Sequence, residues 1–419
     1  MMHIFNRFSW RTLTVFLSVA MLSCSPVFAD SHFEQPSVTT ASSLLPANVI
    51  KGPNHTVRNV VHNDGFLNIY DIDSKYGTLR AVSTATLHKR IGELNAMAGM
   101  EQLKGTEEFM HGITDQAGKF VEGGVGLITH PVDSISGAVS GLASLFKSVG
   151  GTLHYGKSET ESGRLSMISG FDKTKREYAA EYDVDVYSRN QYLQDELNEI
   201  SRAGFLGKSI IRLGGAAATG GAGVALSVTG NVQAFNDLMR TKSAGDLRIL
   251  IQDKLEKIGV SSDLIEVFIE NRNFTLSQQT ALVLALDGMS GTANRVAFIK
   301  FSALTDNDDI AAFRTRQALM YAAYNRSVAP LPAFDYVGQF AVAHDKAGVA
   351  VVCAPLDHAL WTRELSGVVA SISNHLDALP DIKRKSLFVT GSVSAATRQQ
   401  MEKWGWTIKE HSLTALAKK

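Results

Sequence analysis

The sequence predicts an α+β protein with a small N-terminal antiparallel meander, a large and mostly helical middle, and a small C-terminal α/β domain. Short β-prone runs separated by turn residues predict the meander over 51–84. Apolar residues at helical spacing predict a helical region over 85–330. Strand-like and helix-like segments then alternate over 331–419, which predicts the α/β domain.

The N-terminus carries the pattern of an export signal. Arg7 and Arg11 precede an apolar run at 13–22, and small residues follow up to Ala29. A basic start, an apolar core and a small-residue cleavage site predict a signal peptide over 1–29. The run is too short to span a hydrocarbon core of about 30 Å. Lipid attachment at Cys24 is the alternative, so we expect an exported protein, periplasmic or extracellular, or else an outer-membrane lipoprotein.

Composition narrows the class of protein. Of the 419 residues, 45% are hydrophobic and 20% are charged, which is typical of globular domains with sizeable cores. Lys plus Arg and Asp plus Glu both number 41, so net charge favours no nucleic-acid partner. Cleavage after Ala29 would leave Cys353 as the single cysteine, which excludes an intramolecular disulfide. Cys353 lies in an apolar, strand-like run, and we expect a buried thiol there.

Residues 30–50 separate the signal peptide from the meander. They are rich in Ser and Thr and contain Pro36 and Pro46, so we interpret them as a linker. The meander follows, with turns predicted at 63–65 and 75–77, where glycine ends each turn.

Ordinary amphipathic helices make up much of the helical region. In one of them the apolar residues at 247, 250, 251 and 255 form a stripe that would face a core. The segments that begin at Thr275 and Asn307 start with residues that cap helices.

Two glycine-rich segments, 121–151 and 205–230, interrupt this pattern. Gly137 and Gly141 lie four residues apart, so both would lie on one helix face and let another backbone approach. Gly220 and Gly221 lie in the uncharged run of the second segment. Three interpretations stay open: a close-packed helix pair, a hairpin on or in a membrane, and a single membrane span. The many Gly and Ala residues contribute little to membrane insertion, which favours the packed pair.

The C-terminal domain offers the candidate chemistry. Asp357 and His358 follow one predicted strand, and Thr390 follows another. Residues beyond the carboxyl ends of parallel strands line the binding crevice, so these three are the candidate catalytic residues. Ser392 and Ser394 open the next helix, where free amides would form an anion site.

A structural interpretation of the same residues stays open. Ser394 would be an ordinary helix cap, and Asp357 would cap the helix that carries Trp361. The sequence contains no HExxH, CxxC, GxGxxG or P-loop pattern, so we expect no metal and no cofactor.

Several segments together resemble a family of uncharacterised exported bacterial proteins. They are the glycine-rich segment that follows the meander, 170–200, 304–324, 353–362 and 386–406. The resemblance implies the same architecture and export, and it implies no activity.

Two functions follow from these patterns. The first is an exported cell-envelope protein that serves as an interaction module, with a membrane surface or another envelope protein as its partner. The second is an exported hydrolase that uses the crevice of the C-terminal domain. Whether the protein is an enzyme, and its oligomeric state, stay open at this point.

Overall fold

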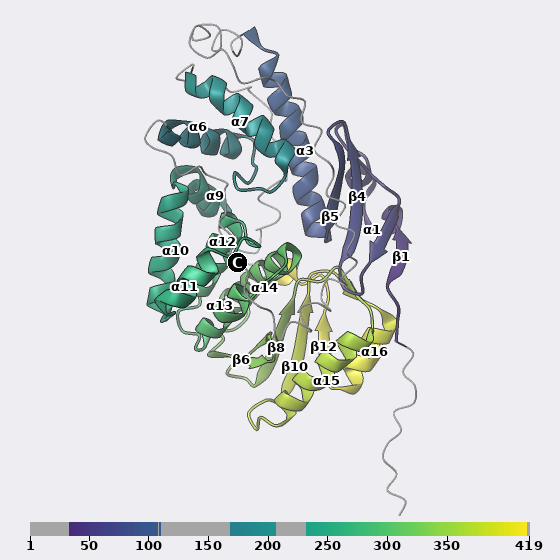
Figure 1. Ribbon diagram of the computed structural model, residues 1–419. Coiled ribbons are helices and arrows are strands. Elements are labelled where there is room, and N and C mark those ends of the chain that lie inside the picture. Colours follow the sequence, from purple (N-terminus) through teal and green to yellow (C-terminus); the bar gives the residue numbers. More distant parts are fainter. Residues whose placement is uncertain (1–32, 108, 110–167, 207–231, 417–419) are drawn as a thin grey trace, which may run out of the picture. The chain divides into compact units, whose positions relative to one another are not determined.

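The computed structural model of the protein describes residues 33–107, 109, 168–206 and 232–416 (Figure 1). Within these ranges an antiparallel sheet comes first, helices follow, and a second sheet with its own helices comes last, which confirms the α+β class. The predicted signal peptide with Cys24 lies outside the described residues. So do Gly137, Gly141, Gly220 and Gly221 of the glycine-rich segments. No helix in the described ranges is long and apolar enough to cross a membrane.

The N-terminal sheet has five strands and is antiparallel throughout. Its strands are β1 (Ser37–Thr40), β2 (Thr56–Val57), β3 (Val60–Asn63), β4 (Asn68–Ser74) and β5 (Gly77–Val82). The turns lie where the sequence predicts them, because Gly65 and Gly77 adopt positive φ angles of 103° and 111°. At the first turn the Asp64 carboxylate accepts hydrogen bonds from the amides of Phe66 and Leu67.

The predicted linker over 30–50 is wrong for its second half. Residues 37–40 form β1, which pairs with β3, and two short helices follow, α1 (Ala41–Leu44) and α2 (Ala47–Ile50). In β1 the side chain of Val38 is exposed, so the strand lacks the buried apolar alternation by which strands are recognised. Its pairing with β3 is a tertiary contact that composition does not reveal.

Nine helices make up the described part of the middle region. They are α3 (Thr84–Lys104), α6 (Ile168–Glu181), α7 (Gln191–Leu206), α9 (Val232–Thr241), α10 (Ala244–Ile258), α11 (Ser262–Ile269), α12 (Leu276–Asp287), α13 (Arg295–Ala303) and α14 (Asp308–Ser327). Ser83 caps α3, Ser243 caps α10, Thr275 caps α12 and Asn307 caps α14, each accepting a hydrogen bond from a first-turn amide.

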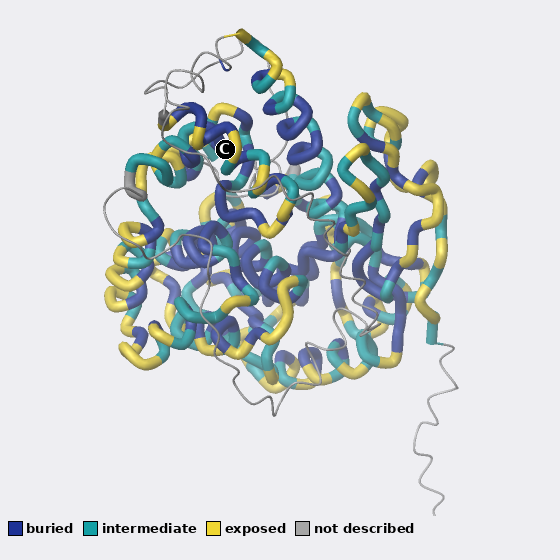
Figure 2. The backbone as a smooth tube through the Cα atoms, turned by 45° about the horizontal axis from the view of Figure 1, so that its top comes forward, coloured by how far each residue is buried: buried dark blue, intermediate teal, exposed yellow. Residues whose placement is uncertain are grey.

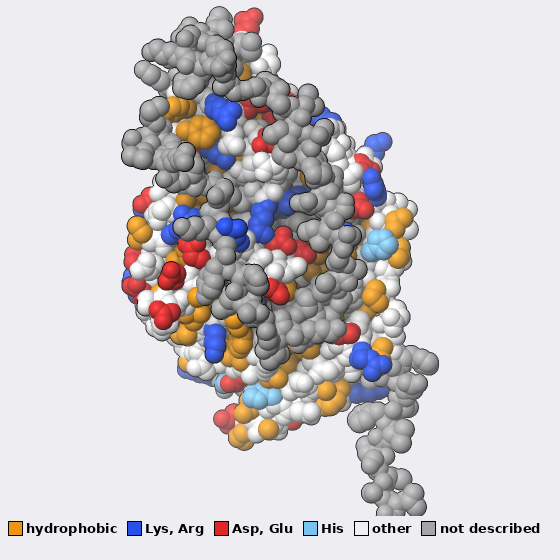
Figure 3. Space-filling view, in the orientation of Figure 1, with side chains coloured by type: hydrophobic (Ala, Val, Ile, Leu, Met, Phe, Trp, Pro, Cys, Tyr) orange, Lys and Arg blue, Asp and Glu red, His pale blue; other side chains and the backbone are white. Residues whose placement is uncertain are grey.

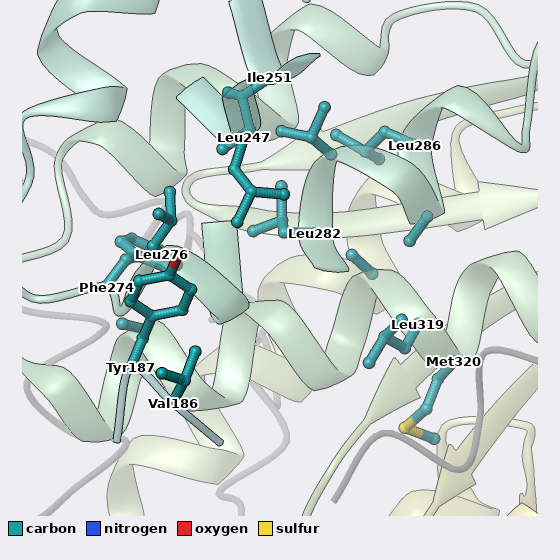
Figure 4. Packing of buried hydrophobic residues seen from close by; sticks show 14 of the residues in the cluster. Val186, Tyr187, Leu247, Ile251, Phe274, Leu276, Leu282, Leu286, Leu319 and Met320 are labelled. Carbon is teal, nitrogen blue, oxygen red and sulfur yellow. The ribbon is translucent and has the colours of Figure 1, made fainter. Parts of the chain in front are cut away.

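The core of this region forms where α12 packs between α10 and α14 (Figure 4). Leu247 and Ile251 of α10 face Leu282 and Leu286 of α12, and all four are buried. The predicted apolar stripe on α10 therefore faces a core. Leu319 of α14 belongs to the same buried cluster.

The C-terminal region is a mixed sheet covered by helices, and its chain order alternates as predicted. The strand order is β12-β10-β8-β7-β6, with β8, β10 and β12 parallel and β6 and β7 antiparallel. Its elements are β6 (Ala333–Val337), β7 (Phe340–His344), β8 (Val349–Ala354), β9 (His358–Ala359), α15 (Arg363–Asp377), β10 (Arg384–Val389), β11 (Ser392–Val393), α16 (Ala395–Lys403), β12 (Trp406–Lys409) and α17 (Leu413–Leu416). Cys353 in β8 is buried, as expected.

Helix α14 joins the helical region to the C-terminal sheet. The Tyr321 hydroxyl donates a hydrogen bond to the carbonyl of Ala341 at 2.6 Å, and the Gln317 amide donates to the carbonyl of Cys353 at 2.9 Å. Figure 2 shows buried backbone continuing through the helices and into the sheet. Residues from Glu34 onward form one compact unit, so the three predicted regions are parts of a single packed body.

Candidate functional site

The structure brings the two candidate segments of the C-terminal domain together. Strands β9 and β11 form a small parallel pair in which His358 lies beside Ser392. The Thr390 hydroxyl donates a hydrogen bond to the carbonyl of Leu356 at 2.7 Å. Gly391 lies so close to the Asp357 carbonyl that a Cβ at this position would overlap it. We call the set Asp357, His358, Thr390, Ser392 and Ser394 the C-terminal crevice.

The backbone amides of the crevice already have acceptors. The Ser392 amide donates to the carbonyl of Asp357 at 3.0 Å, and the Ser394 amide donates to the carbonyl of Ala359 at 2.9 Å. These two amides are therefore not free to bind an anion. The Ser394 hydroxyl caps α16 by accepting a hydrogen bond from the Thr397 amide at 3.0 Å, and it donates to the Glu34 carboxylate at 2.5 Å. Ser394 is therefore the N-cap of α16.

His358 and Ser392 form a close pair of side chains. The distance from His358 Nδ1 to Ser392 Oγ is 2.8 Å, and both side chains are partly buried. A histidine at this distance from a hydroxyl could take up its proton.

The Asp357 carboxylate points away from this pair and caps a distant helix. Asp357 Oδ2 accepts hydrogen bonds from the amide of Asn68 at 3.0 Å and from the amide of Thr84 at 2.9 Å. Thr84 is the first residue of α3, where the positive end of the helix dipole favours a carboxylate. Asp357 therefore does not cap the helix that follows Trp361. Thr362 caps that helix, α15, by accepting a hydrogen bond from the Leu365 amide at 3.2 Å.

Arg316 of α14 and Ser83 complete the surroundings of this carboxylate. Arg316 Nη1 donates a hydrogen bond to Ser83 Oγ at 3.1 Å. Burial raises the pKa of Asp357, and the Arg316 guanidinium together with the two backbone amides acts against that rise. Burial lowers the pKa of Arg316, and the charge of Asp357 acts to raise it. We call Asn68, Ser83, Arg316 and Asp357 the α3 junction, because they tie the meander, α14 and the C-terminal domain to the start of α3.

Ser83 has a strained backbone. Its φ of 90° and ψ of 149° lie in a region that residues with a side chain rarely adopt. The Ser83 amide donates to the carbonyl of Asn68 at 2.8 Å, and the Ser83 hydroxyl accepts from the Thr86 amide at 3.2 Å. Strain of this kind persists where the surroundings hold it, and it gathers at sites with a function.

A cavity of about 110 Å³ lies next to the α3 junction, and we call it the helical cavity. Its walls come from α3, α6, α9, α12 and α14, and from the connection 183–186 between α6 and α7. Four basic and two acidic side chains line it: Lys89, Arg176, Arg240, Arg316, Asp183 and Asp185. In Figure 3 basic side chains gather beside acidic ones across the middle of the face shown.

One ion pair in the cavity wall is closed. Lys89 Nζ lies 2.8 Å from Asp185 Oδ2, and the Ser277 hydroxyl donates to the same carboxylate at 2.5 Å. Burial acts to raise the pKa of Asp185, but Lys89 and Ser277 hold that pKa below its ordinary value. Asp185 therefore remains charged and fixes the connection 183–186 to α3 and α12.

The end of α6 sets the position of Asp183 in the wall. The Val184 amide donates to the carbonyl of Ala179 at 2.8 Å and the Asp183 amide to that of Ala180 at 3.2 Å, the pattern of a Schellman cap. Asp183 occupies the left-handed position of this cap, with a φ of 50°. Glycine is the usual residue there, so an aspartate at this position does not mark the turn.

Sequence reasoning pointed to the C-terminal crevice and missed the helical cavity. Lys89, Arg176 and Arg316 lie on three separate helices, and a charged residue on a helix ordinarily faces solvent. No short motif connects them, since they are separated by long stretches of chain. No cluster of His, Cys, Asp and Glu suited to a metal ion occurs in the described part of the chain.

Searches of protein-family models, of curated proteins and of solved structures found no match to this chain.

Proposed function

We propose that the protein is an exported component of the cell envelope that acts by binding, and that the helical cavity receives a small-molecule ligand. The N-terminal pattern of Arg7, Arg11 and Ala29 supports export. The cavity supports binding, because side chains from five helices converge on one space. A membrane surface or an envelope protein as a further partner would involve the glycine-rich segments.

The observation that carries this proposal is the arrangement of the wall. Ala312, Thr315 and Arg316 of α14 line the cavity together with residues of α6 and α9. Arg316 also belongs to the α3 junction. A ligand in the cavity would therefore lie beside the place where the meander, α14 and the C-terminal domain meet the start of α3.

The test is recovery of a ligand from the purified protein. Protein isolated from its native source would be denatured, and released small molecules would be identified by mass spectrometry. Ala312→Trp places a large ring in the cavity wall and should abolish recovery, whereas Ala47→Trp, at an exposed position of α2, should not. Fractionation of cells with a carbonate wash of the membranes tests export and membrane association. Equal recovery from both variants, or no recovery from any preparation, would contradict the proposed binding site.

A second candidate is the exported hydrolase, and the 2.8 Å contact of His358 Nδ1 with Ser392 Oγ favours it. In such an enzyme His358 would take the proton of Ser392 while the hydroxyl oxygen attacks the ester carbonyl carbon, and the phenol would leave as its C–O bond breaks. Water would then hydrolyse the acyl-serine, which restores the hydroxyl and releases the acid. Asp357 would position the loop through its bonds to the meander and α3. Hydrolysis of p-nitrophenyl esters by the purified protein, lost in Ser392→Ala and kept in Ser366→Ala, would support it. Equal rates in both variants would contradict it.

A further inference from the structure

The basic side chains of the helical cavity come from four different helices. They are Lys89 of α3, Arg176 of α6, Arg240 of α9 and Arg316 of α14. Because Lys89 and Asp185 pair with each other, the rest of the lining holds three guanidinium groups and one carboxylate, that of Asp183. The lining side chains therefore carry more positive than negative charge, although Arg240 pairs with Asp237 of its own helix at 3.2 Å. Charges in a partly enclosed space interact more strongly than in water.

Arg316 has unused hydrogen-bonding capacity. Within the described ranges, its guanidinium donates one hydrogen bond, to Ser83 Oγ. A guanidinium carries five N–H donors in a planar fork. Among the described residues, no carboxylate oxygen lies within 4.0 Å of the Arg316 guanidinium nitrogens. The charge of Asp357 acts on Arg316 from a greater distance. Arg316 is one of the residues that line the cavity.

We infer that the helical cavity binds a small organic anion, whose carboxylate or phosphate group is held by the Arg316 guanidinium. This inference rests on the proposed function, because it names the class of ligand for the same cavity. The planar fork of an arginine matches two oxygens of a carboxylate or phosphate, which a neutral group cannot offer with the same strength.

The rest of the wall indicates the body of the ligand. Phe235, Met239, Val184 and Val186 present apolar groups to the cavity. An inorganic ion would leave this part of the wall without a partner, whereas a compact apolar body would cover it. The cavity volume of about 110 Å³ is of the same order as the roughly 150 Å³ of a closed cavity that holds benzene in an engineered protein. Because the helical cavity is partly open, a single ring can enter it with its charged end. The ligand is therefore a small acid with one charged end.

The test compares ligands that differ only in charge. Isothermal titration of the full-length protein with benzoate, phenyl phosphate and benzamide, up to about 10 mM, covers the affinities expected of such fragments. We expect benzoate or phenyl phosphate to bind at least tenfold more tightly than benzamide. Inorganic phosphate should bind more weakly than phenyl phosphate, because it lacks the apolar body.

Two cavity variants and one surface variant complete the test. Arg316→Gln keeps a donor for Ser83 and removes the charge, so binding of the anions should weaken tenfold or more. Arg240→Gln should weaken anion binding less than Arg316→Gln does. Because the Arg240 side chain is half-exposed, this substitution should not unfold the protein. Arg202→Gln, at an exposed position of α7, should leave binding unchanged. Circular dichroism of each variant reports whether it folds.

The outcomes separate the inference from the proposed function. Equal binding of benzoate and benzamide, or a neutral molecule recovered from the native protein, would overturn the anion inference and leave the binding function in place. Anion binding that Arg316→Gln leaves unchanged would overturn it as well. Absence of binding by every anion, with no ligand recovered, would overturn both.

Discussion

The C-terminal crevice and the helical cavity belong to the same compact unit and differ in how their polar groups are used. In the crevice the Asp357 carboxylate accepts two backbone amides, and the amides of Ser392 and Ser394 donate to neighbouring carbonyls. In the cavity the Arg316 guanidinium donates one hydrogen bond within the described residues, and Arg316 lines the open volume. The crevice uses its polar groups to hold the chain together, and in the proposed function those of the cavity would meet a ligand.

The difference teaches that a local concentration of reactive residue types does not by itself identify a binding site. Polar residues at the ends of neighbouring strands come close through short loops, so they can satisfy one another. Charged residues on separate helices meet only when the helices pack. Where that packing leaves a space, a side chain such as Arg316 can keep donors that its neighbours do not use.

The largest effect should come from removing the Asp357 carboxylate. Asp357→Ala leaves the amides of Asn68 and Thr84 without an acceptor, and each buried unsatisfied donor costs on the order of 1–3 kcal/mol. We expect a loss of about 3 kcal/mol in the free energy of unfolding, measured by urea denaturation. Asp357→Asn retains an acceptor oxygen and should cost clearly less. Equal stability of Asp357→Ala and the parent protein would break the comparison, because the crevice would then not be holding the chain.

A smaller effect is expected at Gly391. A Cβ at this position would overlap the Asp357 carbonyl, so Gly391→Ala should force β9 and β11 apart and cost about 2 kcal/mol. Gly367→Ala is the matched control, because a Cβ at that exposed position of α15 meets no atom within 4 Å. The control should gain about 0.5 kcal/mol by lowering the entropy of the unfolded chain. Thermal unfolding of both variants measures the difference, and similar melting temperatures would refute the close contact.

The smallest effect on stability should come from the cavity. Arg240 has a side chain that is 47% exposed and pairs with Asp237 on the same helix at 3.2 Å. Arg240→Gln should therefore change the free energy of unfolding by less than about 0.5 kcal/mol. Urea denaturation under the conditions used for Asp357→Ala makes the two values comparable. A cost near that of Asp357→Ala would mean that the cavity charges are structural too.

Local sequence patterns predicted much of the fold and the neighbourhood of the crevice. The turns at Gly65 and Gly77 were predictable because glycine alone adopts their backbone angles without strain. The caps at Thr275 and Asn307 were predictable because the hydroxyl or amide oxygen bonds to amides two or three residues ahead. The approach of Asp357 to Ser392 was predictable because neighbouring parallel strands end at one edge of a sheet.

Tertiary structure alone decided what those residues do. Asp357 accepts a hydrogen bond from the Thr84 amide, 273 positions away in the chain, and no local pattern can select that partner. Strand β1 exists because β3 offers it a free edge, although its own residues resemble a linker. Arg316 reaches the helical cavity because α14 is bonded to the start of α3 through Ser83 and to the C-terminal sheet through Gln317. Sequence determines the propensities of single elements, whereas the contacts between distant elements depend on which apolar faces bury each other, and that is settled only when the whole chain packs.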